Sequence, residues 1–245
     1  GWHYNLIEAF DQPWKRASEG AVGGYWGLFD ADRQDKGVLV GPVTNVPYWP
    51  LWLGIGGLIL LGTLVLGGRV HSRRAALALP LLGAVAACSI GTWAELTRVT
   101  ARFNDEWVWA GLLVALNLLV LAHAALALSA REGWRQRAFD WLEQRAGWLV
   151  AFAGFAGAVM MLALVFDPRY RSFPSAALVL PALVYLVRPV TGPRREIALL
   201  TFIIGAGIAP QLFREGLLNQ QAWGWAVVSG LIVAALWRCL RVRRG

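Results

Sequence analysis

Three ionisable side chains near the start of the sequence have the types needed for chemistry. Glu8 and Glu19 are carboxylic acids, and Lys15 between them could neutralise a carboxylate and so tune its pKa. Trp14 and Trp26 lie close by, and an indole ring can stack on the face of a sugar. Retaining glycoside hydrolysis needs two carboxylates about 5–5.5 Å apart. Nothing in the spacing of Glu8 and Glu19 makes them such a pair, so we expect supporting roles.

These residues are expected on a strand and on the loop that follows it. Residues 2–10 are rich in aromatic and aliphatic side chains and precede turn-forming residues, which predicts a strand. Alternation along that strand places Glu8 and Phe10 on one face. Residues 11–30 then form a loop with an aromatic turn, and residues 31–50 form a linker with Pro, Gly and Asp.

The composition places most of the chain among membrane proteins. Of its 245 residues, 57% are hydrophobic and 16% are charged, and the mean hydropathy is +0.50. A soluble domain carries roughly 25% charged residues. The 14 tryptophans agree with this class, because Trp is enriched at membrane–water interfaces.

From about residue 50 onward, apolar runs follow one another at lengths that suit membrane crossing. A helix needs about 20 apolar residues to cross a hydrocarbon core about 30 Å thick. Seven runs predict seven transmembrane helices, at residues 51–68, 75–94, 108–129, 148–166, 174–187, 196–213 and 222–237. The fifth run is short and contains Pro181, so a re-entrant segment there is the alternative.

Arginines alternate between the loops that join these runs. Fourteen follow the first, third, fifth and seventh runs, whereas five follow the second, fourth and sixth. Cytoplasmic loops carry an excess of Lys and Arg, so we expect the C-terminus in the cytoplasm and the N-terminal segment on the other side. The formal net charge of +8 is therefore mainly a topology signal, and no nucleic-acid partner is expected.

Segment 131–146 differs from the other loops. It places Trp134, Ala138, Trp141 and Leu142 on one helical face, with arginines elsewhere. This pattern predicts an amphipathic helix. Contact with the lipid surface and a solvated loop helix are both open interpretations.

Few polar residues interrupt the apolar runs. Asn117 and His123 lie in the third run, six residues apart and thus not on one helical face, while Glu95 and Glu196 stand at the ends of runs. Ionisable residues within a membrane are functional candidates by default. We expect a packed or snorkelling role for His123 and an interfacial role for the glutamates.

The two cysteines are expected to be chemically inert. Cys88 lies inside an apolar run and Cys239 lies near the basic C-terminal end, so they should fall at different depths. Neither a disulfide nor a metal site is predicted from this spacing, and no cofactor is expected.

Residues 4–30 also carry a specific order of motifs. They read Glu8-Ala9-Phe10-Asp11-Gln12-Pro13-Trp14-Lys15, then Glu19, then Tyr25-Trp26-Gly27-Leu28-Phe29-Asp30. This order resembles the eighth barrel strand and following loop of glycoside hydrolase family 17, the β-1,3-glucanases and related β-glucan transglycosylases. The likeness is greatest to bacterial membrane-bound members tied to β-glucan synthesis, including those called β-(1→6)-glucan synthases.

The resemblance implies the fold class and the domain plan. The chain is expected to be an all-α membrane protein with about seven transmembrane helices, preceded by the last strand and loop of a (β/α)₈ barrel. Residues 1–30 would end the catalytic domain, 31–50 would be a linker and 51–245 the membrane domain. The family's two catalytic glutamates end its fourth and seventh strands, so we expect them upstream of Gly1 and no catalytic residue in this chain.

The resemblance also implies where substrate would be bound, because active sites of such barrels lie at the C-terminal ends of the strands. The family often has glutamate at the position of Gln12, and an amide can bind a hydroxyl but cannot ionise. Barrel packing is the other interpretation for the aromatic residues, and a surface ion pair is the other one for Lys15 with Glu19. The substrate-binding candidates are Glu8, Phe10, Asp11, Gln12, Trp14, Lys15, Glu19 and Trp26.

The function implied is that of a membrane-anchored glycoside hydrolase or transglycosylase that acts on β-1,3-glucan in bacterial β-(1,3)/(1,6)-glucan synthesis or remodelling. The expected partners are β-glucan, the lipid bilayer and a glucan synthase. The expected location is the bacterial inner membrane, with the N-terminal segment in the periplasm. Two alternatives stay open: a membrane module for glucan export or synthase docking without chemistry of its own, and spans that only anchor.

Overall fold

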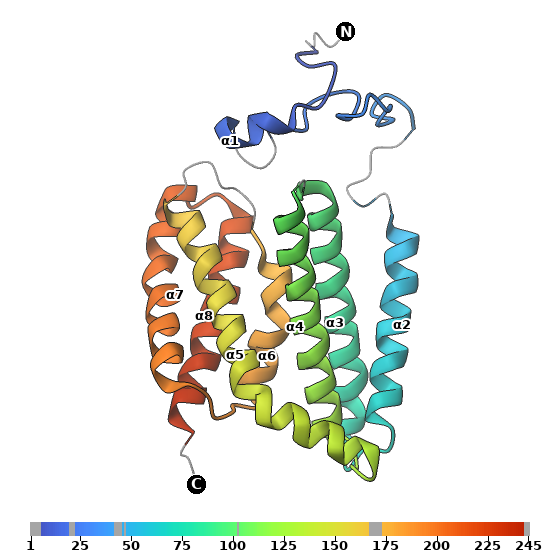
Figure 1. The fold of residues 1–245 in the computed structure, drawn as a ribbon, viewed down its shortest axis with the longest axis vertical. Coiled ribbons are helices and arrows are strands. Elements are labelled where there is room, and N and C mark those ends of the chain that lie inside the picture. Colours follow the sequence, from blue (N-terminus) through green and yellow to red (C-terminus); the bar gives the residue numbers. More distant parts are fainter. Residues whose placement is uncertain are drawn as a thin grey trace.

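A bundle of long helices dominates the chain, with a short N-terminal segment lying above one end of it (Figure 1). The structure, a computed structural model, describes residues 6–19, 23–41, 46, 48–101, 103–166 and 173–242. The segment contains a 3₁₀ turn, Pro13–Lys15, and the one-turn helix α1, Arg16–Glu19. The bundle consists of α2 (Trp49–Gly67), α3 (Arg73–Thr100), α4 (Asn104–Leu128), α5 (Trp134–Phe166), α6 (Ser175–Val187), α7 (Arg194–Glu215) and α8 (Gln220–Arg241).

Six of these helices, α2 to α5 with α7 and α8, are long and apolar enough to cross a membrane. This confirms the multi-span helical class that the composition predicts. The fifth predicted run forms only the 13-residue helix α6. At 1.5 Å per residue α6 is about 20 Å long, which is less than a hydrocarbon core about 30 Å thick. The prediction of seven full spans is therefore replaced by six long helices and one short helix.

Helix α6 can be short because protein surrounds it. It packs against α3, α4, α5 and α8, and seven of its residues are buried, including Leu178 and Tyr185. Asn117 of α4 donates a hydrogen bond to the Ala177 carbonyl at 2.8 Å and another to its own helix at Leu113, also at 2.8 Å. A helix that ends at membrane depth is tolerated where protein, and not lipid, covers its ends.

Successive helices of the bundle run in opposite directions, so the N-terminal segment and the end of α8 lie at opposite ends (Figure 1). We call the end next to the N-terminal segment the segment end. The other end, with the α2–α3, α4–α5 and α6–α7 connections, is called the arginine-rich end. Its described residues include Arg69, Arg73, Arg74, Arg131, Arg135, Arg137, Arg188, Arg194, Arg195, Arg238 and Arg241.

The barrel strand predicted over residues 2–10 is not formed in its described part. Residues 6–9 carry no strand, and Phe10 makes a single isolated parallel bridge to Phe29. Around it, Asp11 N–H donates to the Phe29 carbonyl at 2.9 Å and Phe29 N–H donates to the Ala9 carbonyl at 3.0 Å. A strand needs a neighbour that continues the pairing, and here the chain turns away at Asp30. Residues 2–5 of that prediction lie outside the described residues.

Helix α2 lies at one edge of the bundle and is mostly open to lipid, because only Thr63 and Gly67 among its residues are buried. Small residues bring it close to α3. A Cβ added at Gly67 would lie 2.3 Å from Leu79, and one added at Gly83 would lie 2.8 Å from Leu60. Close approach at small residues is a common way for membrane helices to associate, because it maximises van der Waals contact.

The segment predicted to be an amphipathic helix is the first part of α5, whose 33 residues also include the fourth predicted run. The helix changes direction between these two parts (Figure 1). Phe139 and Leu142 are buried and form a cluster with Leu126 of α4. Trp134 and Trp141 are 49% and 48% exposed. The helix is confirmed, but its buried face contains Leu142 without the two tryptophans.

The two parts of α5 meet near Gly147, where the α6–α7 connection comes very close. A Cβ added to Gly147 would lie 2.3 Å from the Thr191 carbonyl oxygen and 2.7 Å from Gly192 Cα. Both are backbone atoms, so no flexible side chain can move aside. Any side chain at this position must displace the connection between α6 and α7.

We predict that Gly147→Ala destabilises the bundle, by about 1–3 kcal/mol, because overpacking against backbone has no cheap relaxation. The control is Gly111→Ala in α4, where an added Cβ meets nothing within 4 Å. There, alanine should be neutral or stabilising because it favours the helix. Thermal unfolding of both variants in the same detergent measures the difference. Equal melting temperatures for the two would contradict the contact.

Candidate functional site

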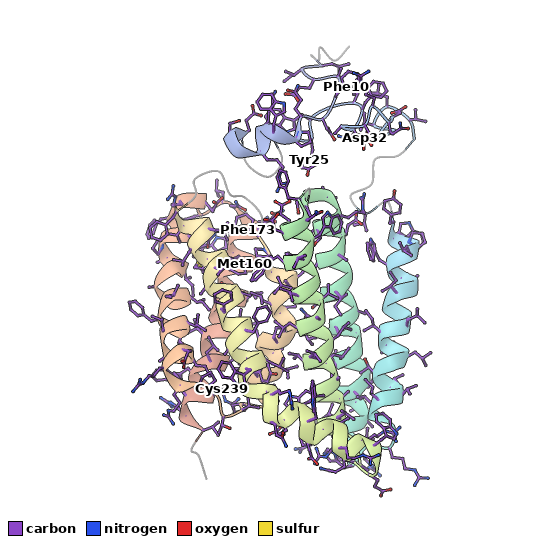
Figure 2. All side chains as sticks on the ribbon, viewed as in Figure 1. Phe10, Tyr25, Asp32, Met160, Phe173 and Cys239 are labelled. Atoms are coloured by element: carbon purple, nitrogen blue, oxygen red, sulfur yellow. The ribbon has the colours of Figure 1, made fainter. Side chains whose placement is uncertain are left out.

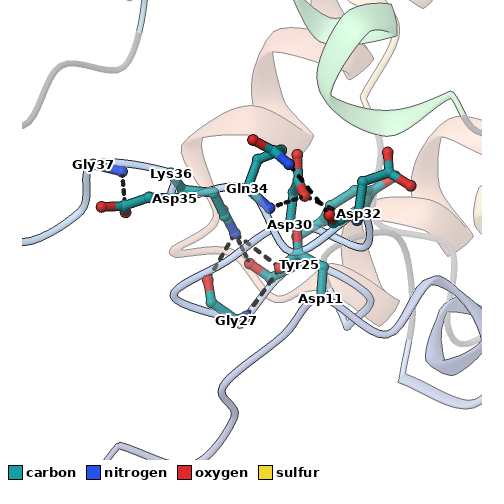
Figure 3. A network of polar contacts seen from close by, with 9 residues as sticks. All are labelled: Asp11, Tyr25, Gly27, Asp30, Asp32, Gln34, Asp35, Lys36 and Gly37. Carbon is teal, nitrogen blue, oxygen red and sulfur yellow. Dashed lines mark hydrogen bonds and ion pairs between the residues drawn. The ribbon is translucent and has the colours of Figure 1, made fainter.

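Asp11 is the centre of the folded N-terminal segment. Its Oδ1 accepts a hydrogen bond from Gly27 N–H at 3.0 Å and lies 2.8 Å from Lys36 Nζ (Figure 3). Lys36 Nζ also donates to the carbonyls of Tyr25 and Gly27, both at 2.9 Å. Asp11 is 6% exposed. The carboxylate therefore joins the loop after residue 23 to the chain before it, which is a structural role.

Phe10 and the Trp26-Gly27-Leu28-Phe29 motif pack against each other. The ring centroids of Phe10 and Phe29 are 5.6 Å apart, and the Arg33 guanidinium lies 5.6 Å from the Phe10 ring. A Cβ added at Gly27 would come within 2.2 Å of the Phe10 carbonyl carbon. Glycine is therefore required where the motif crosses residues 10 and 11, so the spacing of the two motifs has a packing reason.

Glu8 and Lys15 form an ion pair on the other side of the segment. Glu8 is buried, and Lys15 Nζ lies 5.7 Å from the centre of the Trp14 ring. The hydrogen bond to Glu8 raises the pKa of Lys15 above its ordinary value of 10.5, and the charge of Glu19 acts in the same direction. Because the pKa of the folded state is the higher one, the pair stabilises the segment at neutral pH. That stabilisation is lost as the pH rises through the raised pKa.

The remaining polar candidates are placed by the main chain. Gln12 N–H donates to the Gly24 carbonyl at 3.0 Å, and the Gln12 carbonyl accepts from Lys15 N–H at 2.9 Å. Glu19 ends α1 and is exposed. Glu8 is engaged by a lysine, and Glu19 sits on an exposed helical turn. This arrangement does not show the two facing carboxylates that retaining glycosidases use.

Trp14 and Trp26 are the most exposed of the aromatic candidates. Trp14 is 69% exposed and Trp26 is 53% exposed. An exposed indole offers a large flat apolar face together with one N–H donor. Phe10, at 42% exposure, adds a third partly open ring. The acids and bases of the segment are mostly used in holding it together, whereas its aromatic rings are open to a ligand.

Among the described residues, Arg16 and Tyr25 connect the segment to the bundle. The Arg16 guanidinium binds Glu106, at the start of α4, through two hydrogen bonds of 2.7 and 3.1 Å. Tyr25 points toward the bundle, and its hydroxyl donates to the Thr100 carbonyl at 3.2 Å (Figure 2). Bidentate pairs of this kind fix orientation as well as position. Arg16, Tyr25 and Lys36 are key contacts that the sequence patterns did not single out, because their partners lie 90, 75 and 25 residues away.

A second polar cluster lies at the arginine-rich end, within the bundle. His123 of α4 is fully buried, and its Nε2 is 2.7 Å from Glu143 Oε2. Arg188, which follows α6, donates to the same Glu143 oxygen at 2.8 Å and lies 2.9 Å from His123 Nε2. The arrangement is consistent when His123 Nε2–H donates to Glu143, since Arg188 can then donate to the same carboxylate. His123 is packed, as expected, and it joins α4, α5 and α6.

The described residues contain no group of three or more His, Cys, Asp or Glu side chains that could hold a metal ion. Comparisons of this chain with protein families, curated proteins and solved structures found no match. The likeness to glycoside hydrolase family 17 therefore stands on the motif residues alone.

We predict that Lys36→Met loosens the N-terminal segment, because it leaves the buried Asp11 carboxylate without its cation. Loss of a hydrogen bond to a buried charged group costs about 1.5–3 kcal/mol. Hydrogen–deuterium exchange of residues 24–37 should therefore speed up roughly tenfold or more, while exchange in α4 and α5 is unchanged. Asp32→Asn, an exposed acidic residue of the same loop, is the matched control and should have no effect. Unchanged exchange in Lys36→Met would show that the Asp11–Lys36 pair does not hold the segment.

Proposed function

We propose that this chain is the membrane-anchored part of a β-glucan-active glycoside hydrolase or transglycosylase, acting on β-1,3-glucan in bacterial β-(1,3)/(1,6)-glucan synthesis or remodelling. The observation that carries the proposal is the exposure of Trp14 and Trp26 on a segment in which Glu8 is paired with Lys15 and Asp11 with Lys36. The family-like order of motifs supports it. In this proposal the segment binds the sugar chain at the membrane surface and does not itself break bonds.

Seven of the eight candidate residues have a place in this proposal. Trp14 and Trp26 stack on glucose units, because pyranose faces are apolar and match an indole ring in size. Asp11 and Lys36 hold the loop that carries Trp26, and Glu8 with Lys15 holds the turn that carries Trp14. Gln12 and Glu19 supply polar groups for sugar hydroxyls. A glucan synthase in the same membrane is the proposed protein partner.

The orientation in the membrane is part of the proposal. Arginine gathers at one end of the bundle and the N-terminal segment lies at the other (Figure 1). The excess of positive charge in cytoplasmic loops favours a cytoplasmic arginine-rich end and a periplasmic segment, in the bacterial inner membrane. A periplasmic segment is exposed to extracytoplasmic polysaccharide, which is what a glucan-active protein requires.

We predict that the chain in lipid nanodiscs binds linear β-1,3-gluco-oligosaccharides, and that Trp14→Ala and Trp26→Ala each weaken binding about three- to tenfold through lost stacking. Isothermal titration with laminarihexaose measures this. Trp148→Ala is the matched control, because Trp148 is 66% exposed but lies beside the α6–α7 connection at the other end. The chain alone is expected to release no sugar from the glucan.

Absence of oligosaccharide binding, or equal effects of all three tryptophan variants, would contradict sugar binding by the segment. The competing function, glucan export or synthase docking by the bundle alone, would then be favoured by glucan movement across proteoliposomes that contain the chain. If removing the N-terminal segment abolished glucan movement, the segment and the bundle would act together in export. If movement persisted, the bundle alone would be sufficient.

We predict that a cysteine at position 32 is labelled from the periplasmic side and one at position 132 from the cytoplasmic side. Asp32→Cys and Glu132→Cys are introduced separately in a Cys88→Ala and Cys239→Ala background, and both positions are exposed. A membrane-impermeant maleimide is applied to spheroplasts and to inverted vesicles. Labelling of both positions from the same side would contradict the three crossings by α2, α3 and α4 that lie between them. Labelling of position 32 from the cytoplasmic side and of position 132 from the periplasmic side would overturn the orientation.

A further inference from the structure

A groove runs along the bundle between α3, α4 and α6, close to the arginine-rich end. Its volume is about 410 Å³, within the range of roughly 300–1,000 Å³ that ligand sites occupy. Leucine and valine side chains from α3 and α6, including Leu82 and Val184, form its walls, and Ala78, Ala124 and Ala127 leave the space between them. The groove is therefore a hollow made by small residues among large ones, and its lining is apolar along most of its length.

A second cavity, of about 550 Å³, continues this groove beyond the helix ends. His71, Ala127 and Arg188 line both spaces, so the two adjoin each other. The rest of its lining is Ser129, Ala130, Arg131 and Gln136, three of which are polar or charged. No carboxylate is among the described residues that line either space. An apolar groove thus opens into a cationic mouth.

The mouth is built from fixed backbone. The α2–α3 and α4–α5 connections are joined by an antiparallel bridge between Val70 and Ser129, and Ala130 N–H donates to the Arg69 carbonyl at 2.6 Å. This pairing holds the connection that carries His71 beside the connection that carries Arg131. The mouth is therefore preorganised, and a ligand would not have to pay for ordering two loops.

The two guanidinium groups of the mouth are held over one aromatic ring. Arg131 Cζ lies 4.0 Å and Arg188 Cζ lies 5.2 Å from the centre of the Phe139 ring. Glu143 binds Arg188, and Arg131 has no carboxylate partner among the described residues. Asp140 accepts a hydrogen bond from the mouth residue Gln136 at 2.7 Å, but neither Asp140 nor Glu143 lines the mouth itself. The Arg131 guanidinium therefore leaves positive charge in the mouth, which favours an anion there.

We propose that the groove and its cationic mouth bind one anionic phospholipid of the bilayer, with an acyl chain along α3, α4 and α6 and the phosphate between Arg131 and Arg188. The two parts match the two parts of such a molecule. Arginine suits a phosphate because its planar donors can bind two oxygens at once. The apolar groove suits an acyl chain because the chain packs more closely against the groove than against the mobile chains of the bilayer. The position at the helix ends is the depth at which lipid phosphates lie.

The test is native mass spectrometry of the full chain titrated with phosphatidylglycerol or with phosphatidylcholine of the same acyl chains. Phosphatidylglycerol should bind more tightly, and Arg131→Gln should weaken it about tenfold while leaving phosphatidylcholine unchanged. Arg137→Gln, an exposed arginine at the same end that lines neither space, is the charge control and should have an effect below about twofold. Arg131 is preferred to Arg188 for the test, because removing Arg188 also removes the arginine that binds Glu143.

A second variant tests the groove separately from the mouth. Ala127→Leu fills the junction of the two spaces and should reduce binding of both lipids, whereas Ala115→Leu, on an exposed face of α4, should not. Equal affinity for the two lipids together with no effect of Arg131→Gln would overturn the proposal. So would a polyisoprenyl phosphate that binds more than about tenfold more tightly than phosphatidylglycerol, because the occupant would then be a lipid carrier. Sugar binding at the segment end is independent of each of these results.

Discussion

Hydrocarbon offers no hydrogen-bond partner to a peptide group, and this constraint governs residues 48–242. Every long element there is a helix that satisfies its own backbone. Where the chain departs from a full crossing, protein supplies what lipid cannot: α6 is enclosed by four other helices, and the Asn117 amide binds a carbonyl near its start. The same constraint favours pairing of ionisable side chains, as with His123, Glu143 and Arg188.

The sequence predicts those parts of the fold that depend on local composition. Run length and hydropathy locate six long helices, and the alternation of arginines matches the alternating direction of the helices. Composition alone does not show how a short apolar run will be covered, so α6 was expected as a seventh full span. The strand over residues 2–10 is the clearest miss in local structure. Its residues have strand-like types, but a strand requires a partner, and only Phe29 pairs with its described part.

The candidate site divides in the same way. The two motif stretches, residues 8–15 and 25–30, lie in one folded unit, with a glycine where the two segments cross. The partners that hold the unit together come from elsewhere: Lys36 for Asp11, and Glu106 for Arg16. Such pairs depend on three-dimensional proximity across long stretches of chain, and no local pattern encodes them. The mouth at the arginine-rich end is likewise made from the α2–α3, α4–α5 and α6–α7 connections. In the sequence, each of these connections by itself indicates only a basic loop.

Lysine and arginine are unevenly distributed between the N-terminal segment and the bundle, and this has a further consequence. Of the 23 lysine and arginine residues, only Lys15 and Lys36 are lysines, and both lie in the N-terminal segment with buried carboxylates as partners. The other 21 are arginines, whose guanidinium groups stay protonated at any pH at which a protein is folded. The positive charge of the membrane-facing bundle is thus largely set by groups that do not titrate. Side-chain amine chemistry is confined to the segment, so acylating reagents modify that segment alone and leave the bundle unmarked.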